Sequence, residues 1–261
     1  MNILSYGAGT NSTALLVGLH ERDIRPDYIT FSDTGGEKPH TYEYIKIMQA
    51  WLKKVDFPEI TIVKKVDKNG DVLTLEDDCL NTGTLPSIAY GFKKCSHKYK
   101  IQPQDKFFNN LPEAREVWKK GEKINKMIGF DAGEERRAGV RDDKKYMFSY
   151  PLIDWGWYRE DCIEAIVRAG LPKPGKSSCF FCPSSKKNEI FELNRKYPEL
   201  ALRALEIEEK AAPSLTSIKG LGRSFSWTDL LKQGDLFDAP EVIEPCSSCW
   251  DGSSTEDEDE A

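Results

Sequence analysis

A strand, a glycine-rich loop and a helix follow one another at the start of this chain. The apolar residues Ile3, Leu4 and Tyr6 predict a buried strand, and Thr13 to Leu19 continue as an apolar helix. Residues 7–12 between them read Gly-Ala-Gly-Thr-Asn-Ser. Glycine lets the backbone approach a ligand closely, and the free amide groups at the start of a helix favour an anion. The unit therefore predicts a phosphate-binding loop. An ordinary strand–helix turn is the alternative, because neither the Walker nor the dinucleotide fingerprint is present.

Further strand and helix signals follow along the chain. Residues 27–31 and 60–63 predict short apolar strands, and residues 41–54 have helical spacing between them. Residues 125–130 predict a fourth strand and residues 146–150 a fifth. This alternation is typical of a parallel sheet with crossover helices. We therefore expect an α/β fold, a Rossmann-like parallel twisted sheet, followed by a helical, cysteine-containing C-terminal part.

Polar, glycine-containing loops follow three of these strands. They occupy residues 7–12, 33–36 and 129–137, and the last contains Arg136 and Arg137. Because ligands of such sheets bind beyond the carboxyl ends of the strands, the three loops should meet at one edge. Arginine side chains can bind phosphate bidentately, so this edge suits a nucleotide. As the alternative, Asp33 would only cap the following helix through an Asx turn.

The charge is unevenly distributed along the chain. The net charge is −6, and residues 251–261 carry six acidic residues and no basic one, so the rest of the chain is balanced. A balanced body gives no indication of nucleic-acid binding, and the acidic tail is expected to be disordered. No apolar run approaches the roughly 20 residues that span a bilayer, and no secretory signal is recognisable. We expect a cytoplasmic protein without a membrane partner.

Three regions are expected along the chain. Residues 1–172 form the nucleotide-binding α/β domain. Residues 173–250 form a helical region that contains cysteines, and residues 251–261 form the acidic tail. The 261 residues are enough for one α/β domain with additions.

The chain has seven cysteines, and four of them form two C-x-x-C pairs, Cys179 with Cys182 and Cys246 with Cys249. In a protein without secretory signals, paired cysteines indicate metal or redox chemistry rather than structural disulfides. Cys162 is different, because it falls on the apolar face of a helix predicted over residues 159–169. It is expected to be a core thiol.

One cysteine lies in a strongly basic stretch. Residues 93–100 place four lysines and His97 around Cys95. Neighbouring positive charges stabilise a thiolate, so we expect the pKa of Cys95 to be lowered and an anionic ligand to bind nearby. A solvated charged face is the simpler alternative.

Six segments are organised like the motifs of one known family. They are Ser5 to Leu16, similar to S-G-G-x-D-S-T-A-L-L; Phe31 to Glu37, similar to F-x-D/E-T-G; Cys95 to Pro103, similar to C-x-x-x-K-V/I-x-P; Gly129 to Arg137, similar to G-x-R-x-x-E/D-S-x-x-R; Pro151 to Trp155, similar to P-L-x-x-W; and Cys179 to Pro183, similar to a C-x-x-C element. In this order they resemble the PAPS (phosphoadenosine phosphosulfate) reductase family. That family belongs to the adenine nucleotide alpha-hydrolase superfamily, which includes the PP-loop ATP pyrophosphatases.

The resemblance implies a nucleotide site at the three loops. The nucleotide-binding residues it implies are Ser5, Gly7, Gly9, Thr10, Asn11, Ser12, Asp33, Thr34, Gly129 and Arg136. It also implies that cations offset the negative charge that develops during reaction, and the expected catalytic residues are Lys98, Lys100 and Arg137. The expected ligand is ATP or a PAPS-type sulfonucleotide, with Mg²⁺ as a further cofactor.

The resemblance also implies a cysteine-ligated metal centre. Cys95, Cys179 and Cys182 are the expected ligands of a 4Fe–4S cluster, because the sequence distance from Cys95 to the C-x-x-C pair is similar to that in the iron–sulfur branch of the family. The fourth ligand is open: Cys79, Cys246, Cys249 or an exchangeable iron position would serve. As the alternative, the two C-x-x-C pairs would bind zinc.

Two departures from the family leave the reaction open. Asn11 stands where many pyrophosphatases carry aspartate, which weakens the Mg²⁺ interpretation, and the reductases' C-terminal nucleophile motif E-C-G-I/L-H is missing. The first departure favours thiolate attack on a sulfonucleotide, an oxidoreductase reaction. The second favours attack on the α-phosphate of ATP, often for sulfur transfer.

The expected function is therefore that of a nucleotide-binding enzyme in sulfur metabolism or sulfur transfer. Its partners would be a small-molecule nucleotide and a sulfur or electron donor or acceptor that the sequence does not identify; the oligomeric state is equally open. A non-catalytic nucleotide-binding or partner-binding protein on the same fold is the alternative.

Overall fold

A five-stranded parallel sheet forms the centre of the computed structural model, which describes residues 1–86, 88–89, 92–139 and 142–234. Its strands are β1 (Asn2–Tyr6), β2 (Tyr28–Asp33), β3 (Ile60–Lys64), β6 (Ile124–Met127) and β7 (Tyr146–Ser149). They lie in the order β3-β2-β1-β6-β7, and every neighbouring pair is parallel. The α/β fold with a Rossmann-like parallel sheet is thus confirmed. The fourth predicted strand ends at Met127 rather than residue 130, because the chain turns there into the loop described below.

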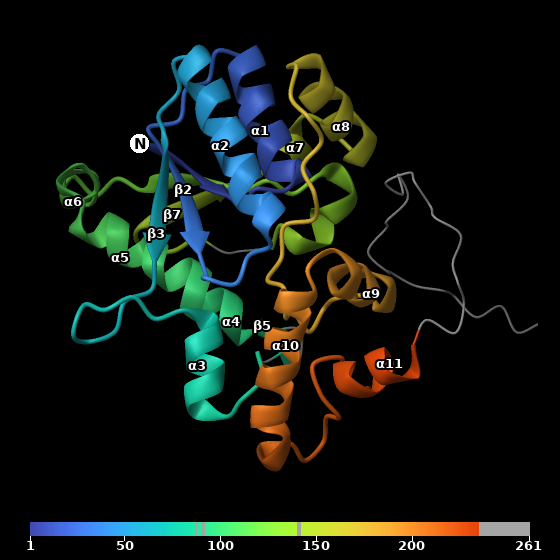
Figure 1. Ribbon diagram of the computed structural model, residues 1–261. Helices are drawn as coiled ribbons and strands as arrows, with labels where there is room; N and C mark the ends of the chain where they lie inside the picture. The colour runs from blue at the N-terminus through green and yellow to red at the C-terminus, as the bar shows by residue number, and fades with distance from the viewer. Residues whose placement is uncertain (87, 90–91, 140–141, 235–261) are drawn as a thin grey trace, which may run out of the picture.

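Helices cover both faces of the sheet (Figure 1). On one face, α1 (Thr10–Glu21), α2 (Pro39–Lys54), α7 (Pro151–Asp154) and α8 (Arg159–Arg168) share a hydrophobic core with Leu4 and Tyr6 of β1. On the other face, α5 (Gln102–Asn110) and α6 (Pro112–Lys119) pack with Ile3. Successive side chains of a strand point to opposite faces, so β1 is covered on both sides. This explains why its residues read as a nearly continuous apolar run.

A second hydrophobic cluster contains the C-terminal helices. These are α9 (Lys187–Lys196), α10 (Pro198–Ala211) and α11 (Trp227–Gln233), with a short 3₁₀ turn, η3 (Ala212–Ser214), after α10. They pack against α3 (Leu75–Thr82) and against Tyr99 of the π-helical turn η1 (His97–Ile101). The expected helical C-terminal part is therefore present, and it shares its core with residues from the middle of the chain. The domain boundary at residue 172 stays a prediction.

Local sequence signals explain several helix boundaries. A capping box starts α3, in which the Asp77 amide donates to the Thr74 hydroxyl and the Thr74 amide donates to the Asp77 carboxylate. Ser226 caps α11 in the same way, by accepting from the Asp229 amide. The remaining short elements are β4 (Ile88–Ala89), β5 (Phe92–Lys93), α4 (Lys94–Ser96) and the 3₁₀ turn η2 (Ala132–Arg137).

Cys246, Cys249 and the acidic tail lie outside the described residues. Within the described ranges, no helix combines the length and the apolar character needed to cross a membrane.

Candidate functional site

The loops after β1 and β6 meet where the order of the sheet reverses. β2 and β3 extend the sheet to one side of β1, whereas β6 and β7 extend it to the other. Such a switch point leaves a crevice beyond the carboxyl ends of the strands, where ligands of α/β sheets bind. Gly129 approaches the first turn of α1 so closely that a Cβ there would lie 3.0 Å from the backbone of Asn11 and Ser12. The sequence thus correctly predicted that these two loops converge.

Asn11 joins the two loops through its side chain. Its amide nitrogen donates to Asp131 Oδ2 at 3.0 Å and to Glu134 Oε2 at 2.8 Å. Its amide oxygen accepts from Arg159 Nη1 of α8 at 3.0 Å. Glu134 also pairs with Arg137. Two carboxylates and two arginines therefore surround Asn11.

The glycine-rich loop is shaped by its own side chains. Ser12 Oγ donates to the Gly9 carbonyl at 3.1 Å and accepts from the Gly7 amide at 3.2 Å. Ala8 has a φ of 56°, a left-handed conformation that costs a non-glycine residue free energy and is common at ligand sites. Among the described residues no side chain caps α1, and its first turn contains no acidic residue. Its N-terminal amides are therefore available to an anion.

The loop after β2 is held by Asp33, whose side chain is 7% exposed. Its Oδ1 accepts from the Gly35 amide at 2.8 Å and from the Tyr42 hydroxyl at 2.7 Å, and its Oδ2 pairs with Lys64. Burial alone would raise the pKa of Asp33, but these interactions outweigh it and lower the pKa below its usual value. Gly35 has a φ of +75° beside Thr74, so this turn requires glycine. Asp33 thus forms an Asx turn with Gly35, but it does not cap α2, whose N-cap residue is Lys38.

The C-x-x-C segment folds onto the same edge of the sheet. The Phe180 amide donates to the Gly36 carbonyl at 2.8 Å, and Glu37 and Cys179 form an isolated antiparallel bridge. Cys179 Sγ lies 3.1 Å from Thr34 Oγ1. Two residues before Cys179, the Ser177 hydroxyl donates to the Gly7 carbonyl. The segment therefore contacts both the glycine-rich loop and the loop after β2.

The predicted catalytic cations all have carboxylate partners. Lys98 pairs with Asp78 at 2.6 Å, and Lys100 pairs with Glu37 at 3.1 Å. Burial alone would lower the pKa of Lys100, but the negative charge of Glu37 outweighs burial and raises it. Arg137, besides pairing with Glu134, lies 4.3 Å from the centre of the Phe130 ring. The other predicted arginine, Arg136, is exposed.

The expectation that the basic stretch lowers the pKa of Cys95 is wrong. The pKa is raised, because burial of the thiol and the nearby Cys182 outweigh the attraction of Lys93 and Lys100. Cys95 also packs against the second hydrophobic cluster, which removes it from water. The sequence showed the surrounding charges but not this burial.

Cys95, Cys179 and Cys182 lie close enough for electrostatic interaction. Cys182 contributes to the raised pKa of both Cys95 and Cys179. Within the described part of the chain, however, no three His, Cys, Asp or Glu side chains converge on a position that could hold a single ion. A tetrahedral zinc site needs its sulfur atoms about 2.3 Å from one ion, a condition that these side chains do not meet as they lie. The cysteine trio stays a prediction.

The other described cysteines are core residues. Cys79 and Cys162 are buried, and burial raises the pKa of each to about 12. Cys162 belongs to the core beneath α1 and α8, as the sequence predicted. Cys79 belongs to the second cluster, against which Cys95 and Cys179 also pack.

Three residues near the site escaped the sequence analysis. Gln104 links Ser5 to Ser32, accepting from Ser5 Oγ at 2.8 Å and donating to Ser32 Oγ at 3.1 Å. Ser32 in turn donates to the Lys100 carbonyl, so this chain of hydrogen bonds fixes η1 to β1 and β2. Arg159 and Glu37 are the other two. Only Glu37 had a signal in the sequence, its place at the end of the second-strand motif.

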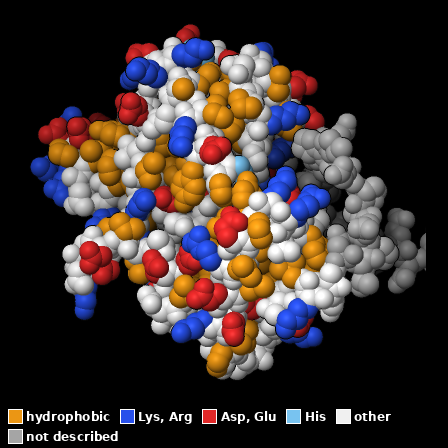
Figure 2. Space-filling model, in the orientation of Figure 1, with side chains coloured by type: hydrophobic (Ala, Val, Ile, Leu, Met, Phe, Trp, Pro, Cys, Tyr) orange, Lys and Arg blue, Asp and Glu red, His pale blue; other side chains and the backbone are white. Residues whose placement is uncertain are grey.

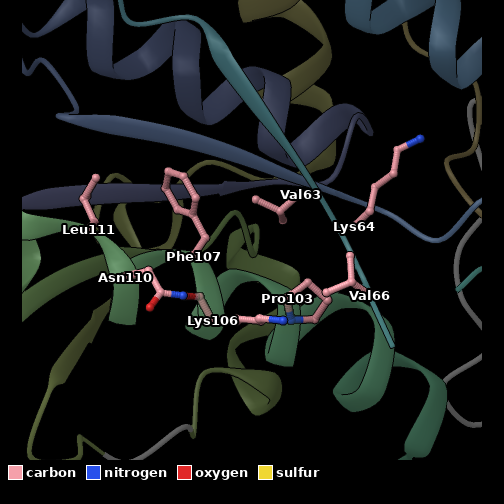
Figure 3. A pocket seen from close by; sticks show the side chains of 8 residues that line it. All are labelled: Val63, Lys64, Val66, Pro103, Lys106, Phe107, Asn110 and Leu111. Carbon is pink, nitrogen blue, oxygen red and sulfur yellow. The ribbon is translucent and has the colours of Figure 1, made fainter. Parts of the chain in front are cut away.

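A pocket of about 340 Å³ lies beside the edge strand β3, away from the converging loops (Figure 3). Its lining is mainly apolar, with two lysines: Val63, Lys64, Val66, Pro103, Lys106, Phe107, Asn110 and Leu111. In Figure 3 the Lys64 ammonium group points away from Phe107 and Leu111, and it pairs with Asp33 at 3.1 Å. The pocket thus borders the site at one residue. On the face seen in Figure 2, basic and acidic side chains are interspersed.

The fold and the loops define a doubly wound α/β protein with its candidate site at the switch point. No model of a known protein family matches the sequence, and no curated protein matches it. Among solved structures, the chain is similar to the U34-tRNA thiolase NcsA from Methanococcus maripaludis with its 4Fe-4S cluster. The TM-score is 0.42 and the identity 14%, over 91% of this chain and 82% of that chain. This likeness is too low to assign an activity or a substrate.

Proposed function

We propose that this protein is an enzyme that binds ATP and cleaves it at the α-phosphate to AMP and pyrophosphate, as the PP-loop pyrophosphatases do. The supporting observation is the meeting of the loops after β1 and β6 at the switch point, where Gly129 contacts the uncapped start of α1. Because the α1 amides have no side-chain cap among the described residues, they suit phosphate oxygens. The second-strand loop with Asp33 and Thr34 lies at the carboxyl edge of the adjacent strand, where the adenosine would bind.

Cleavage at this site is a displacement at phosphorus. An acceptor atom attacks the α-phosphorus, the bond from that phosphorus to the bridging oxygen breaks, and pyrophosphate leaves with the electron pair. Arg137, Arg159 and Lys100 supply positive charge where negative charge develops. Each is held by a carboxylate or amide, which fixes its position before the substrate binds. With water as the acceptor the product is AMP.

The surroundings of Asn11 support ATP over a sulfonucleotide. Asn11 lacks the charge of the family's aspartate, but Asp131 and Glu134 contact its amide group. Carboxylate oxygens are ligands that Mg²⁺ accepts, either directly or through water. The negative charge that Asn11 lacks is thus supplied by the loop after β6, and a Mg²⁺ ion that accompanies ATP would lie near these two carboxylates.

Cys95, Cys179 and Cys182 would hold an iron–sulfur cluster beside this site. The donor set fits, because thiolates are the usual ligands of such clusters and because these thiols lie in a partly buried group around Cys182. When bound, the cluster would supply sulfur or electron chemistry to the activated acceptor. Zinc at two C-x-x-C pairs remains the alternative metal, and its second pair lies outside the described residues.

PAPS reduction is the second candidate function, and the missing C-terminal nucleophile motif counts against it. That reaction needs a thiolate to attack sulfur. Cys95 and Cys179 are already assigned to the metal centre in the proposal above. The basic residues around Cys95 remain the feature that favours this candidate.

The test is a product assay on the full-length protein. With ATP and Mg²⁺ we expect AMP and pyrophosphate in equal amounts, whereas with PAPS and a dithiol we expect no sulfite. Sulfite without AMP would replace the proposal by the reductase. If neither product forms while ATP still binds, the protein is a binding module.

A matched pair of arginine variants locates the activity. Both Arg159 and Arg168 lie on α8, but only Arg159 reaches the phosphate-binding loop, whereas Arg168 pairs with Glu21. Arg159→Ala should lower kcat/KM for ATP by at least about tenfold, corresponding to roughly 1.4 kcal/mol. Arg168→Ala should not change it. Equal effects of the two substitutions would contradict this site.

A further inference from the structure

Glu37 is a buried carboxylate with an unused oxygen atom. Its side chain is 0% exposed, and its Oε1 accepts from Lys100 Nζ at 3.1 Å. Its Oε2 is buried and has no hydrogen-bond partner among the described residues. A buried carboxylate oxygen without a hydrogen bond costs free energy, so we expect Oε2 to have a ligand or metal ion as its partner.

Glu208 shows how this same chain buries a carboxylate for structural reasons. It is 4% exposed, and each of its oxygens accepts two hydrogen bonds, from Leu221 and Trp227 to Oε2 and from the amide and hydroxyl of Thr228 to Oε1. Glu37 is equally buried, but only its Oε1 has partners among the described residues, Lys100 Nζ and Cys179 Sγ. A structural role would leave both oxygens of Glu37 satisfied in the way that those of Glu208 are.

The position of Glu37 indicates what the missing partner is. Glu37 and Cys179 are paired across the isolated bridge, and Cys179 Sγ lies 4.0 Å from Glu37 Oε1. Lys100 and Thr34 contact the same pair of residues. Both contacts of Glu37, to Lys100 and to Cys179, are made by Oε1, so the unused Oε2 belongs to a carboxyl group that lies directly beside Cys179, one of the predicted metal ligands.

We propose that Glu37 is the fourth protein ligand of the metal centre formed with Cys95, Cys179 and Cys182, binding iron through Oε2 while Oε1 keeps Lys100. This inference rests on the iron–sulfur centre of the proposed function. A metal-bound carboxylate is commonly hydrogen-bonded through its other oxygen, which is the arrangement that Lys100 provides. Carboxylate is a harder ligand than thiolate, so the iron bound to Glu37 differs from the other three and is the first to be lost.

The test compares iron centres rather than activity. Full-length wild type, Glu37→Gln and Glu37→Ala are reconstituted without oxygen from ⁵⁷Fe and sulfide. Wild type should bind about four irons per chain, and its Mössbauer spectrum should contain one iron site distinct from the other three. The two variants should lose that site, retain about three irons and show the paramagnetic signal of a three-iron cluster after mild oxidation. Glu21→Gln, a carboxylate variant on α1 that is paired with Arg168, should behave as wild type.

Two further variants keep the test decisive. If Glu37→Gln does not fold, as judged by circular dichroism, Glu37→Asp is used, because it keeps the charge for Lys100 but withdraws the oxygen by one methylene. It should also lose the distinct iron. Lys100→Gln should keep all four irons, since Lys100 only orients the carboxylate.

Four irons with an unchanged spectrum in the Glu37 variants would overturn the proposal and leave the proposed function standing. A wild-type protein that takes up no iron, or zinc instead, would overturn it as well. The release of AMP and pyrophosphate from ATP, measured separately, then decides the nucleotide chemistry.

Discussion

Gly129→Ala tests whether the close approach of two loops builds the nucleotide site. The added Cβ would lie 3.0 Å from Asn11 C, Asn11 O and Ser12 Cα, all backbone atoms. Ordinary carbon contacts are about 3.5–4.0 Å, so the loop after β6 must move from α1 by about 0.5 Å or more. Backbone atoms cannot rotate away as a side chain end would. The displacement therefore falls on the amides that are proposed to hold phosphate.

Two opposing effects set the size of the stability change. Overpacking costs about 1–3 kcal/mol, whereas a Gly→Ala change stabilises a protein by about 0.4–1 kcal/mol through the unfolded chain. The net loss is about 0.5–2 kcal/mol, which for a chain of this size lowers Tm by about 1–8 °C. A lost phosphate hydrogen bond costs about 1–1.5 kcal/mol, so affinity for ATP should fall by about tenfold.

Calorimetric titration with a non-hydrolysable ATP analogue and a thermal melt measure the two effects. Gly139→Ala is the matched control, because a Cβ at Gly139, in the segment that follows the same loop, meets no atom of the described residues within 4 Å. It should keep wild-type affinity and be neutral or slightly stabilising. If Gly129→Ala binds the analogue as wild type does, the phosphates are not held where these loops meet.

Three further substitutions have definite expected outcomes. Asp33→Asn should reduce the loss of unfolding free energy at acid pH. The pKa of Asp33 is lowered in the folded state, so its carboxylate stabilises the fold above the unfolded pKa near 4, and this stabilisation is lost as pH falls through the folded pKa. Denaturant unfolding between about pH 2 and 5 measures this, and parallel profiles would contradict it. Glu208→Gln should lower the free energy of unfolding by about 2–4 kcal/mol, because that buried carboxylate accepts four hydrogen bonds. A Tm within about 1 °C of wild type, less than the shift that about 1 kcal/mol produces, would show that these hydrogen bonds do not stabilise the packing of α11. Cys162→Ala should cost about 1 kcal/mol of core packing and leave iron content unchanged, whereas loss of iron would place Cys162 in the metal centre.

Much of the fold follows from short-range signals. The apolar residues Ile3, Leu4, Ile29 and Phe31 predicted strands, and they lie in strands of a sheet that is covered on both faces. The capping box at Thr74 and Asp77 starts α3 through contacts three residues apart. Such signals need no knowledge of distant residues. The end of β6 does depend on distant residues, because Met127 is the last residue that pairs with β1 and β7.

The candidate site was predictable to the extent that strand ends share an edge. The loops after β1, β2 and β6 were expected together, and parallel pairing brings them together. The partner of each charge was not predictable. Lys98 binds Asp78, and Lys100 binds Glu37, both from segments at least 20 residues away along the chain.

Burial separates what the sequence determined from what the tertiary structure decided. The sequence by itself determined an alternating strand–helix pattern, a glycine-rich loop before α1 and cysteines in a C-x-x-C pair, because these depend on residue type and local spacing. The tertiary structure decided that Cys95 has a raised pKa, that Asn11 lies between two carboxylates and that Glu37 is buried beside Cys179 with one oxygen unpartnered among the described residues. Desolvation and charge pairing depend on which segments pack together, and no local pattern contains that information.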